Sequence, residues 1–307
     1  MPLCPVALLI YARRFRLLIV FLHMRTNYTW KLPRTSFALG QHTLIMGILN
    51  VTPDSFSDGG LSLDPVRAVE RGLEIEKNGA DILDIGGQST RPGSEIITEI
   101  EEIERVIPTI EKLAPLLKIP ISIDTYRAAV ARRAIDAGAQ VINDVSGLRL
   151  DSKMHTLALE TGTAVVLMHS RGKRQALHDQ QPAEKPEVIC SELSETIEKA
   201  VVNGLDPKSV IADPGFGFSK NRSTNLKMLK QLDVFSTLGY PILVGVSRKP
   251  FINLAIPDHE VASWSTAPLV ALAVGNGAHA IRVHDVAEMQ IVAKTLDAIE
   301  TAVTRKD

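Results

Sequence analysis

Eight short apolar segments recur along the chain, each bounded by turn residues and followed by a stretch that fits a helix. Such segments are typical of buried strands, and strands that alternate with helices pair in parallel through helical crossovers. The predicted strands are Leu44–Asn50, Asp81–Ile85, Ile119–Asp124, Gln140–Asp144, Thr163–Met168, Ser209–Asp213, Pro241–Val246 and His279–Val283. Eight such units in about 270 residues favour a single-domain (β/α)8 barrel, the TIM barrel.

The intervening stretches carry helix start and stop signals. Asp64 and Pro65 begin the first predicted helix, and Thr98 with Glu101 forms a capping box for the second. The later helices are predicted at about 126–137, 151–162, 186–202, 225–235, 261–274 and 286–303. A doubly wound open sheet is the alternative architecture. No glycine-rich dinucleotide fingerprint follows the first strand, which weakens that alternative.

The first 34 residues differ from the rest and are interpreted as an extension, with the barrel spanning 35–307. No Asp or Glu occurs before Asp54, whereas this segment is rich in Arg and Lys. Its apolar runs are far shorter than the roughly 20 residues of a membrane span, so no membrane association is expected. A secretory signal or a basic leader stays open on composition. The simpler interpretation is an upstream start codon, with Met24 opening the working protein.

Charge and cysteine usage narrow the class of protein. The formal net charge of −1 argues against a nucleic-acid partner. Cys4 and Cys190 lie far apart and form neither a metal-binding spacing nor a disulfide framework. This usage indicates a reducing compartment, and we expect a cytoplasmic protein.

Polar side chains stand at the carboxyl ends of the predicted strands, where barrels build their active sites. Four are acidic or amide groups that suit a flat, nitrogen-rich ring with N–H donors: Asn50, Asp124, Asn143 and Asp213. Four are cationic and suit a phosphate group near the rim: Arg91, Lys249, Arg282 and His284. Salt bridges between these acids and bases are the alternative interpretation, and Asp144 and Asp285 fit helix caps equally well.

The loops after the first two predicted strands are long and contain glycines, as lids and binding loops do. Phe56 in the first loop, and Phe216 or Phe218 after the sixth strand, suit stacking on a second, aromatic substrate. Each Phe taken alone also fits a core position.

These motifs together resemble those of the dihydropteroate synthases, a family of the folate pathway. The resemblance extends from Leu44 to the last predicted helix. Its motifs are GILNVTPDSFSDGG (Gly47–Gly60), DIGGQSTRPG (Asp84–Gly93), SIDT (Ser122–Thr125), IND (Ile142–Asp144), LMH (Leu167–His169), DPGFGF (Asp213–Phe218), SRK (Ser247–Lys249) and RVHD (Arg282–Asp285). Several are long and all occur in order at strand ends, so the resemblance is specific.

The resemblance implies a Mg²⁺-assisted transferase that condenses a dihydropterin-CH₂ diphosphate with 4-aminobenzoate, giving 7,8-dihydropteroate and diphosphate. The implied pterin contacts are Asp124, Asn143, Asp213 and Lys249, with Met168 as a further substrate contact. Asn50 resembles the Mg²⁺ ligand. Thr90, Arg282 and His284 resemble the diphosphate group's contacts, and Arg91, Phe218 and Ser247 the walls of the aminobenzoate site. The implied catalytic set is Asp124, Asp213, Lys249, Arg282 and His284.

The expected chemistry needs no strong base, because an aniline nitrogen is the nucleophile, and no Ser or Cys paired with a His is evident. We therefore predict a dissociative substitution, with Mg²⁺, Arg282 and His284 stabilising the departing diphosphate. Asp124 and Asp213 would stabilise positive charge on the pterin methylene, and the two glycine-bearing loops would close over it and exclude water.

Two departures from the family pattern stand out. Gln88 replaces the usual Glu, and the segment Ser170–Gln175 is unusually basic, which fits either an altered surface loop or a paralogue with a changed second substrate. A pterin-dependent methyltransferase barrel and a non-catalytic pterin-binding paralogue are the rival functions. The family is commonly dimeric, and Trp264 with Ala267–Ala273 forms an apolar stretch that fits either a dimer interface or the barrel core.

Overall fold

The computed structural model describes residues 25–52, 65–88, 95–173, 177, 179, 181–182, 184–249 and 259–304. Within this part of the chain, eight parallel strands form one sheet in the order β8-β7-β6-β5-β4-β3-β10-β9. A parallel bridge between Ala212 and Ile242 joins β8 to the start of β9 and completes the ring. The strands are β3 (Leu44–Asn50), β4 (Ile82–Gly86), β5 (Ile121–Asp124), β6 (Val141–Asp144), β7 (Ala164–Met168), β8 (Val210–Asp213), β9 (Leu243–Val244) and β10 (Ala280–Val283). The predicted (β/α)8 barrel is confirmed.

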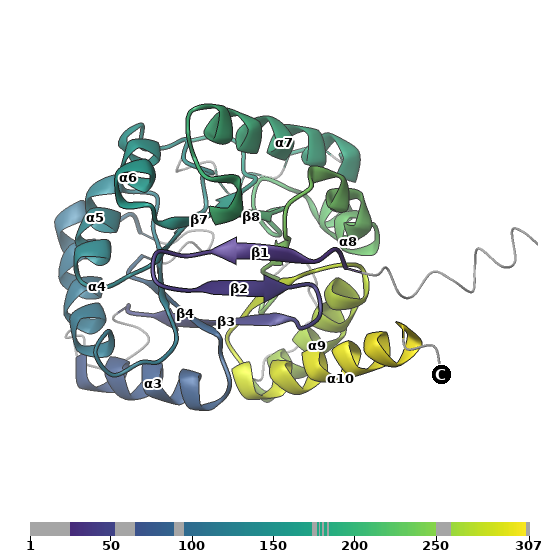
Figure 1. Cartoon of the computed structure of the whole chain (residues 1–307), viewed down its shortest axis with the longest axis horizontal. Helices are drawn as coiled ribbons and strands as arrows, with labels where there is room; N and C mark the ends of the chain where they lie inside the picture. The colour runs from purple at the N-terminus through teal and green to yellow at the C-terminus, as the bar shows by residue number, and fades with distance from the viewer. Residues whose placement is uncertain are drawn as a thin grey trace, which may run out of the picture.

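Helices follow the strands and surround the barrel (Figure 1). They are α3 (Pro65–Lys77), α4 (Glu99–Leu113), α5 (Ala128–Asp136), α6 (Lys153–Thr161), α7 (Pro186–Val202), α8 (Arg222–Lys230), α9 (His259–Gly275) and α10 (Val286–Thr304), with 3-10 helices η2 (Pro207–Ser209) and η3 (Leu232–Leu238). Among the described residues, no helix is long and apolar enough to cross a bilayer.

Two predicted elements differ from the observed ones. The single helix expected over 225–235 is wrong, because Gln231 leaves the helical conformation and the chain continues as η3. The seventh strand is also shorter than predicted, since only Leu243 and Val244 join β9 and Pro241 has no N–H to donate. At α4, Thr98 Oγ1 accepts from the Glu101 amide at 3.1 Å as predicted, whereas the Glu101 carboxylate pairs with Arg105.

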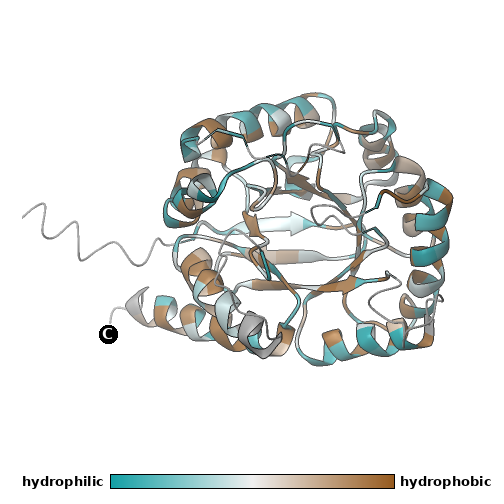
Figure 2. Cartoon of the chain, turned by 180° about the vertical axis from the view of Figure 1, so that it is seen from behind, coloured by the Kyte–Doolittle hydropathy of each residue, from teal (hydrophilic) through white to brown (hydrophobic). Residues whose placement is uncertain are grey.

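Alternation along the strands produces two apolar cores. Outward side chains such as Ile45, Leu83 and Val165 pack against the helices. Inward side chains near the amino ends, such as Ile82 and Ile211, fill the barrel. Figure 2 shows the hydrophobic residues along the strands and a mixture of polar and hydrophobic residues on the helices. Because successive strand residues point to opposite faces, the polar residues two positions further along face the interior at the carboxyl end.

A hairpin that the sequence analysis did not predict covers the amino end of the barrel. β1 (Tyr28–Lys31) pairs antiparallel with β2 (Ser36–Leu39), and both cross the barrel opening in Figure 1. Trp30 is fully buried among the inward side chains and donates from Nε1 to the Ser209 carbonyl at 3.0 Å. The hairpin runs across the expected boundary at residue 34, so residues 25–34 pack with the barrel. Residues 1–24, Met24 included, lie outside the described residues.

Arg25 attaches the start of the described chain to the last helix. Its fully buried guanidinium donates to Asp297 Oδ1 at 2.6 Å and to Glu300 Oε2 at 2.7 Å, and also to Thr43 Oγ1 at 2.7 Å. The Thr43 amide donates to the other Asp297 oxygen at 2.8 Å. A buried cation therefore joins the hairpin segment, the approach to β3 and α10.

Replacing Arg25 should destabilise the whole domain. Arg25→Ala leaves the Asp297 carboxylate buried without its partner, and removal of one member of a buried pair lowers the free energy of unfolding by about 3–5 kcal/mol. The matched control is Lys31→Ala, because the Lys31–Asp206 pair is exposed and such pairs contribute about 0–1 kcal/mol. Urea denaturation measures both, and equal, small losses would contradict the anchoring role of Arg25.

Candidate active site

Polar side chains meet inside the barrel at the carboxyl ends of the strands. The register places Asp124 on β5 beside both Gly86 on β4 and Asn143 on β6. Asp213 on β8 lies beside Met168 on β7. Asn143 and Asp213 are buried, as inward positions require. The structure therefore brings together three of the acidic and amide residues that the sequence analysis selected: Asp124, Asn143 and Asp213.

Arg282 on β10 is the cation at the centre of this layer. Its Nε donates to Asp84 Oδ2 at 2.6 Å and its Nη2 donates to Asp124 Oδ2 at 2.6 Å. Asn143 Nδ2 donates to the same Asp84 oxygen at 3.0 Å. Asp84 is fully buried, and its other oxygen has no hydrogen-bond partner among the described residues. One guanidinium thus orients two carboxylates, of which only Asp124 was a predicted site residue.

Burial shifts the pKa values of the acids and of the bases in this layer in opposite directions. Burial raises the pKa of Asp124 to about 7, although Arg282 opposes the shift. Burial also raises the pKa of Asp213 and lowers the pKa of Lys249 to about 8. Burial acts to lower the pKa of Arg282 as well, but Asp84 and Asp124 outweigh it and raise that pKa. Arg282 is therefore a permanent cation.

The segment after β8 brings an aromatic ring to the site. Lys249 Nζ lies 4.4 Å from the ring centroid of Phe218, a cation–π distance. Phe218 also packs with Met168 in a small apolar cluster. Phe216 instead packs in the outer core, so Phe218 is the one of these two rings that faces the site. Phe56 lies outside the described residues.

Residues after β9 and β10 contact each other. Ser247 Oγ lies 2.9 Å from His284 Nδ1 and accepts from the His284 amide at 3.3 Å. Arg248, between Ser247 and Lys249, has a left-handed φ of 55° and donates to Asp285 at 2.6 Å. Ion pairing among the selected acids and bases, which the sequence left as an alternative, occurs between Arg282 and Asp124, and Arg248 and Asp285 form a further pair. Asp144 accepts from the Ser146 amide at 2.7 Å in the turn after β6 and does not cap a helix, because α6 begins only at Lys153.

Of the remaining predicted site residues, the structure describes Asn50. Asn50 ends β3 beside Gly86 and is half-buried. Thr90, Arg91 and the loop Pro53–Gly60 lie outside the described residues. Sequence reasoning missed Asp84, although residues two apart in a strand share a face and Asp84 therefore lies on the same face as Ile82. It also missed Lys220, a buried cation that no sequence pattern distinguished from an exposed lysine.

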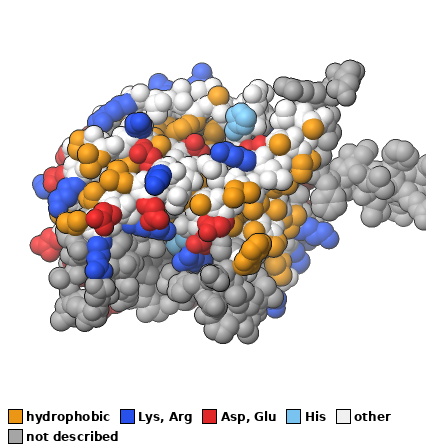
Figure 3. Space-filling view, turned by 90° about the horizontal axis from the view of Figure 1, so that it is seen from below, with side chains coloured by type: hydrophobic (Ala, Val, Ile, Leu, Met, Phe, Trp, Pro, Cys, Tyr) orange, Lys and Arg blue, Asp and Glu red, His pale blue; other side chains and the backbone are white. Residues whose placement is uncertain are grey.

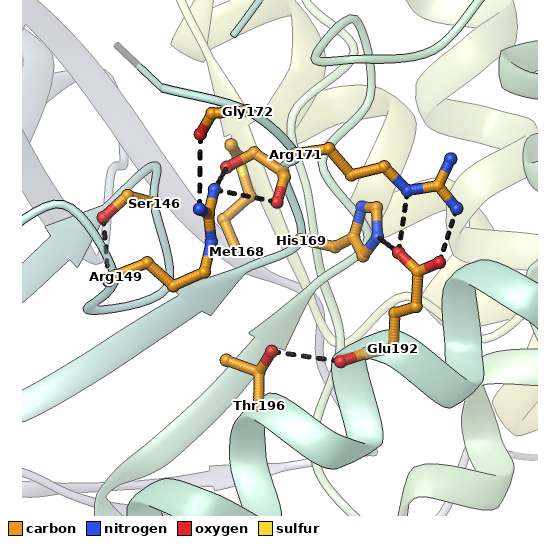
Figure 4. A pocket seen from close by; sticks show the side chains of 9 residues that line it. Ser146, Arg149, Met168, His169, Arg171, Gly172, Glu192 and Thr196 are labelled. Atoms are coloured by element: carbon orange, nitrogen blue, oxygen red, sulfur yellow. Dashed lines mark hydrogen bonds and ion pairs between the residues drawn. The ribbon is translucent and has the colours of Figure 1, made fainter. Parts of the chain in front are cut away.

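A pocket of about 290 Å³ opens between the loops that follow β6 and β7 (Figure 4). Glu192 on α7 accepts from Arg171 Nη2 at 2.6 Å and lies 2.8 Å from His169 Nε2. Burial lowers the pKa of His169 to about 3, and the hydrogen bond from Arg171 lowers the pKa of Glu192 to about 2. Arg149 donates to the Ser170 carbonyl at 3.0 Å. A neutral imidazole and a charged pair therefore hold the loop after β7.

The fold and this site define a barrel of the enzyme type, with a buried layer of charged side chains at the carboxyl ends of its strands. The family model described as "Pterin binding enzyme" matches residues 46–284. Dihydropteroate synthase of Bacillus subtilis is 46% identical over 263 residues, covering 84% of this chain and 89% of that protein. The enzyme of the same name from Synechocystis is 42% identical over 271 residues, covering 87% and 93%.

A solved structure agrees with these relatives. Xanthomonas albilineans dihydropteroate synthase with 4-aminobenzoic acid has a TM-score of 0.82 and 36% sequence identity, covering 92% of this chain and all of that one (100%). The chain belongs to the family of pterin-binding enzymes. Its place within that family is among the dihydropteroate synthases, which are transferases of folate biosynthesis.

The raised pKa of Asp124 predicts how stability changes with pH. A carboxyl whose pKa is raised in the folded state stabilises that state at low pH and loses this contribution as pH rises through the folded-state pKa of about 7. Wild type should therefore lose about 2 kcal/mol of unfolding free energy relative to Asp124→Asn between pH 5 and pH 8. Urea denaturation of both proteins at the two pH values measures this. A constant difference would mean that Arg282 keeps Asp124 ionised throughout.

Proposed function

We propose that the protein condenses a (7,8-dihydropterin-6-yl)methyl diphosphate with 4-aminobenzoate to give 7,8-dihydropteroate and diphosphate. The observation that carries this proposal is the convergence of Asp124, Asn143, Asp213 and Lys249 on one buried layer with Arg282. Carboxylate and amide acceptors suit the N–H groups of a pterin ring, and a permanently charged guanidinium beside them suits the diphosphate. The solved Xanthomonas albilineans enzyme with 7,8-dihydropteroate, 36% identical, supports the same product.

The residues suit a dissociative substitution. Bond breaking to the diphosphate precedes attack by the amine, so positive charge develops on the pterin methylene and negative charge on the departing group. Asp124 and Asp213 are positioned to stabilise the first charge, and Arg282 with His284 the second. Phe218 and Ser247 would line the aminobenzoate site, together with Arg91, while Thr90 would contact the diphosphate. The aniline nitrogen loses its proton after attack, and its low basicity removes the need for a strong base.

Mg²⁺ is the proposed cofactor, with Asn50 as its protein ligand. The described residues contain no group of three or more His, Cys, Asp or Glu side chains that could hold a metal ion. Asn50 instead offers one amide oxygen at the end of β3. This donor set fits Mg²⁺, which keeps several waters and binds through one or two protein oxygens plus substrate phosphates. When bound, Mg²⁺ supplies charge neutralisation at the diphosphate.

Diphosphate release tests the proposed reaction directly. The purified protein receives the dihydropterin diphosphate with Mg²⁺, with and without 4-aminobenzoate, and diphosphate and dihydropteroate are both quantified. Release that requires 4-aminobenzoate and stops on addition of EDTA supports the proposal. Tight pterin binding without turnover would instead favour a non-catalytic pterin-binding paralogue.

Two variants should separate the pterin and diphosphate contacts. Asp213→Asn replaces a carboxylate acceptor and should weaken binding of the pterin by about tenfold or more, with little effect on diphosphate. Arg282→Ala should mainly weaken diphosphate binding. Arg282→Lys is the control, because it keeps a cation near the Asp84 and Asp124 carboxylates. Calorimetry with each ligand measures the affinities, and equal losses of both in Asp213→Asn and Arg282→Ala would contradict this division.

A homodimer is the proposed assembly, formed through adjacent helices α9 and α10. Val270 and Ala273 of α9 are buried against the barrel, whereas Trp264 is 77% exposed and Ile291 of α10 is 67% exposed. Figure 3 shows hydrophobic side chains gathered on the side of the molecule where α10 lies. Exposed apolar patches of this kind mark protein interfaces. A cytoplasmic location is also proposed, consistent with the buried free thiol of Cys190.

A charge introduced at this surface should prevent dimerisation. Trp264→Lys is expected to yield a monomer in size-exclusion chromatography with light scattering, because burial of an ammonium in an apolar interface is unfavourable. Leu116→Lys, a similar change at an exposed residue after α4, should leave the dimer intact. A wild-type monomer, or a dimer that persists in Trp264→Lys, would contradict this interface.

A further inference from the structure

We propose that Lys220 is a positioning residue for 4-aminobenzoate: its ammonium holds the segment after β8 in the shape that presents Phe218 to that substrate. The proposal rests on the proposed function, because that function assigns Phe218 to the wall of the aminobenzoate site. Lys220 follows the DPGFGF motif by two positions and is not part of it.

The three donors of the Lys220 ammonium match three backbone carbonyls. Nζ donates to the carbonyls of Gly215 at 2.9 Å, Phe218 at 2.9 Å and His169 at 3.2 Å. An ammonium has three N–H donors, so each donor has one acceptor. Two of these carbonyls belong to the segment after β8 and the third follows β7. Lys220 is 5% exposed, and water therefore does not compete effectively for these contacts.

The segment that Lys220 holds has an unusual backbone. Gly215 has a φ of +74°, and a Cβ there would collide with the His169 carbonyl oxygen. Ser219 also has a positive φ, of 49°. Its Oγ donates to the Arg171 carbonyl at 2.9 Å, which ties the segment to the loop after β7 a second time. Positive φ at a non-glycine residue is unfavourable unless surrounding contacts impose it, and the Lys220 and Ser219 bonds supply those contacts.

The charge and the N–H donors of Lys220 are what the three carbonyls require of this side chain. Burial lowers the pKa of Lys220 to about 7, with Asp213 and Glu192 opposing the shift and Arg171 and Lys249 adding to it. An apolar side chain of equal length would avoid that desolvation, but it would remove one donor from each of three carbonyls. The Gly215 and Phe218 carbonyls flank the turn on which Phe218 stands. Loss of the hydrogen bonds to these carbonyls would allow the Phe218 ring to move from its place 4.4 Å from Lys249 Nζ.

Most of the proposed pterin contacts stand on strands outside this segment: Asp213 is in β8 itself, and Asp124, Asn143 and Arg282 are in other strands. Two of the pterin contacts do touch the segment, since Asp213 Oδ1 accepts from the Gly215 amide at 2.7 Å and Lys249 lies against the Phe218 ring. Loss of the Lys220 contacts should therefore raise the KM for 4-aminobenzoate by a larger factor than it weakens pterin binding. A residue that only stabilised the barrel would affect both substrates together.

The test compares Lys220→Met with Lys227→Met, the same change at an exposed lysine on α8. For Lys220→Met we expect the KM for 4-aminobenzoate to rise by about tenfold or more, with the pterin Kd changed by less than about threefold. Lys227→Met should match wild type. Lys220→Gln retains two N–H donors and should have an intermediate KM, and it also serves if Lys220→Met does not fold.

A double-mutant cycle with Phe218→Ala isolates the path of the effect. If Lys220 acts through Phe218, Lys220→Met should add little to the KM change already caused by Phe218→Ala. Additive effects, or an unchanged KM in both Lys220 variants, would overturn the proposal. A wild-type protein that forms no dihydropteroate would instead refute the proposed function, so the two failures are distinguishable.

Discussion

The interaction on which the site depends is the placement of one guanidinium between two carboxylates inside the barrel. Arg282 reaches Asp84 and Asp124 at 2.6 Å each, across strands that are far apart in sequence. Two carboxylates without this cation would repel each other in a poorly hydrated interior, and burial would favour their neutral forms. The ion pairs therefore set the orientation of Asp124, and through Asp84 they also set that of Asn143. The geometry and the charge of this layer are consequences of the same three side chains.

The two ends of the barrel meet opposite requirements. At the amino end, the β1–β2 hairpin buries Trp30 over an apolar interior, and the buried Arg25 cluster attaches the segment before it to α10. At the carboxyl end, the inward positions carry charges whose desolvation opposes folding. The apolar amino half of the barrel and the outer core must offset this unfavourable free energy. The stabilising inward apolar side chains therefore lie towards the amino ends of the strands, and the charged site lies at the carboxyl ends.

The sequence predicted the fold and the strand ends well, and its errors have physical causes. Continuous apolar runs bounded by turn residues locate strands such as Leu44–Asn50, whose bounds agree with β3. The hairpin was missed because Tyr28–Lys31 lies in a basic segment, and its burial depends on contacts with Ser209 far along the chain. Lys220 was missed for a related reason: exposed and buried lysines look alike until the fold supplies three carbonyl acceptors. Asp84 could have been predicted as a site residue, because it lies two positions after Ile82 and therefore on the same face of the strand.

The basic segment after His169 left two interpretations open, and its contacts favour a structural one. Arg171 is paired with Glu192, and its backbone amide donates to Ser219 Oγ at 3.0 Å. Lys173 is exposed. Arg171 therefore joins the loop after β7 to α7 and to the segment after β8. Because Phe218 stands on that same segment, a substitution at Arg171 would act on the proposed aminobenzoate wall through the Arg171–Ser219 hydrogen bonds.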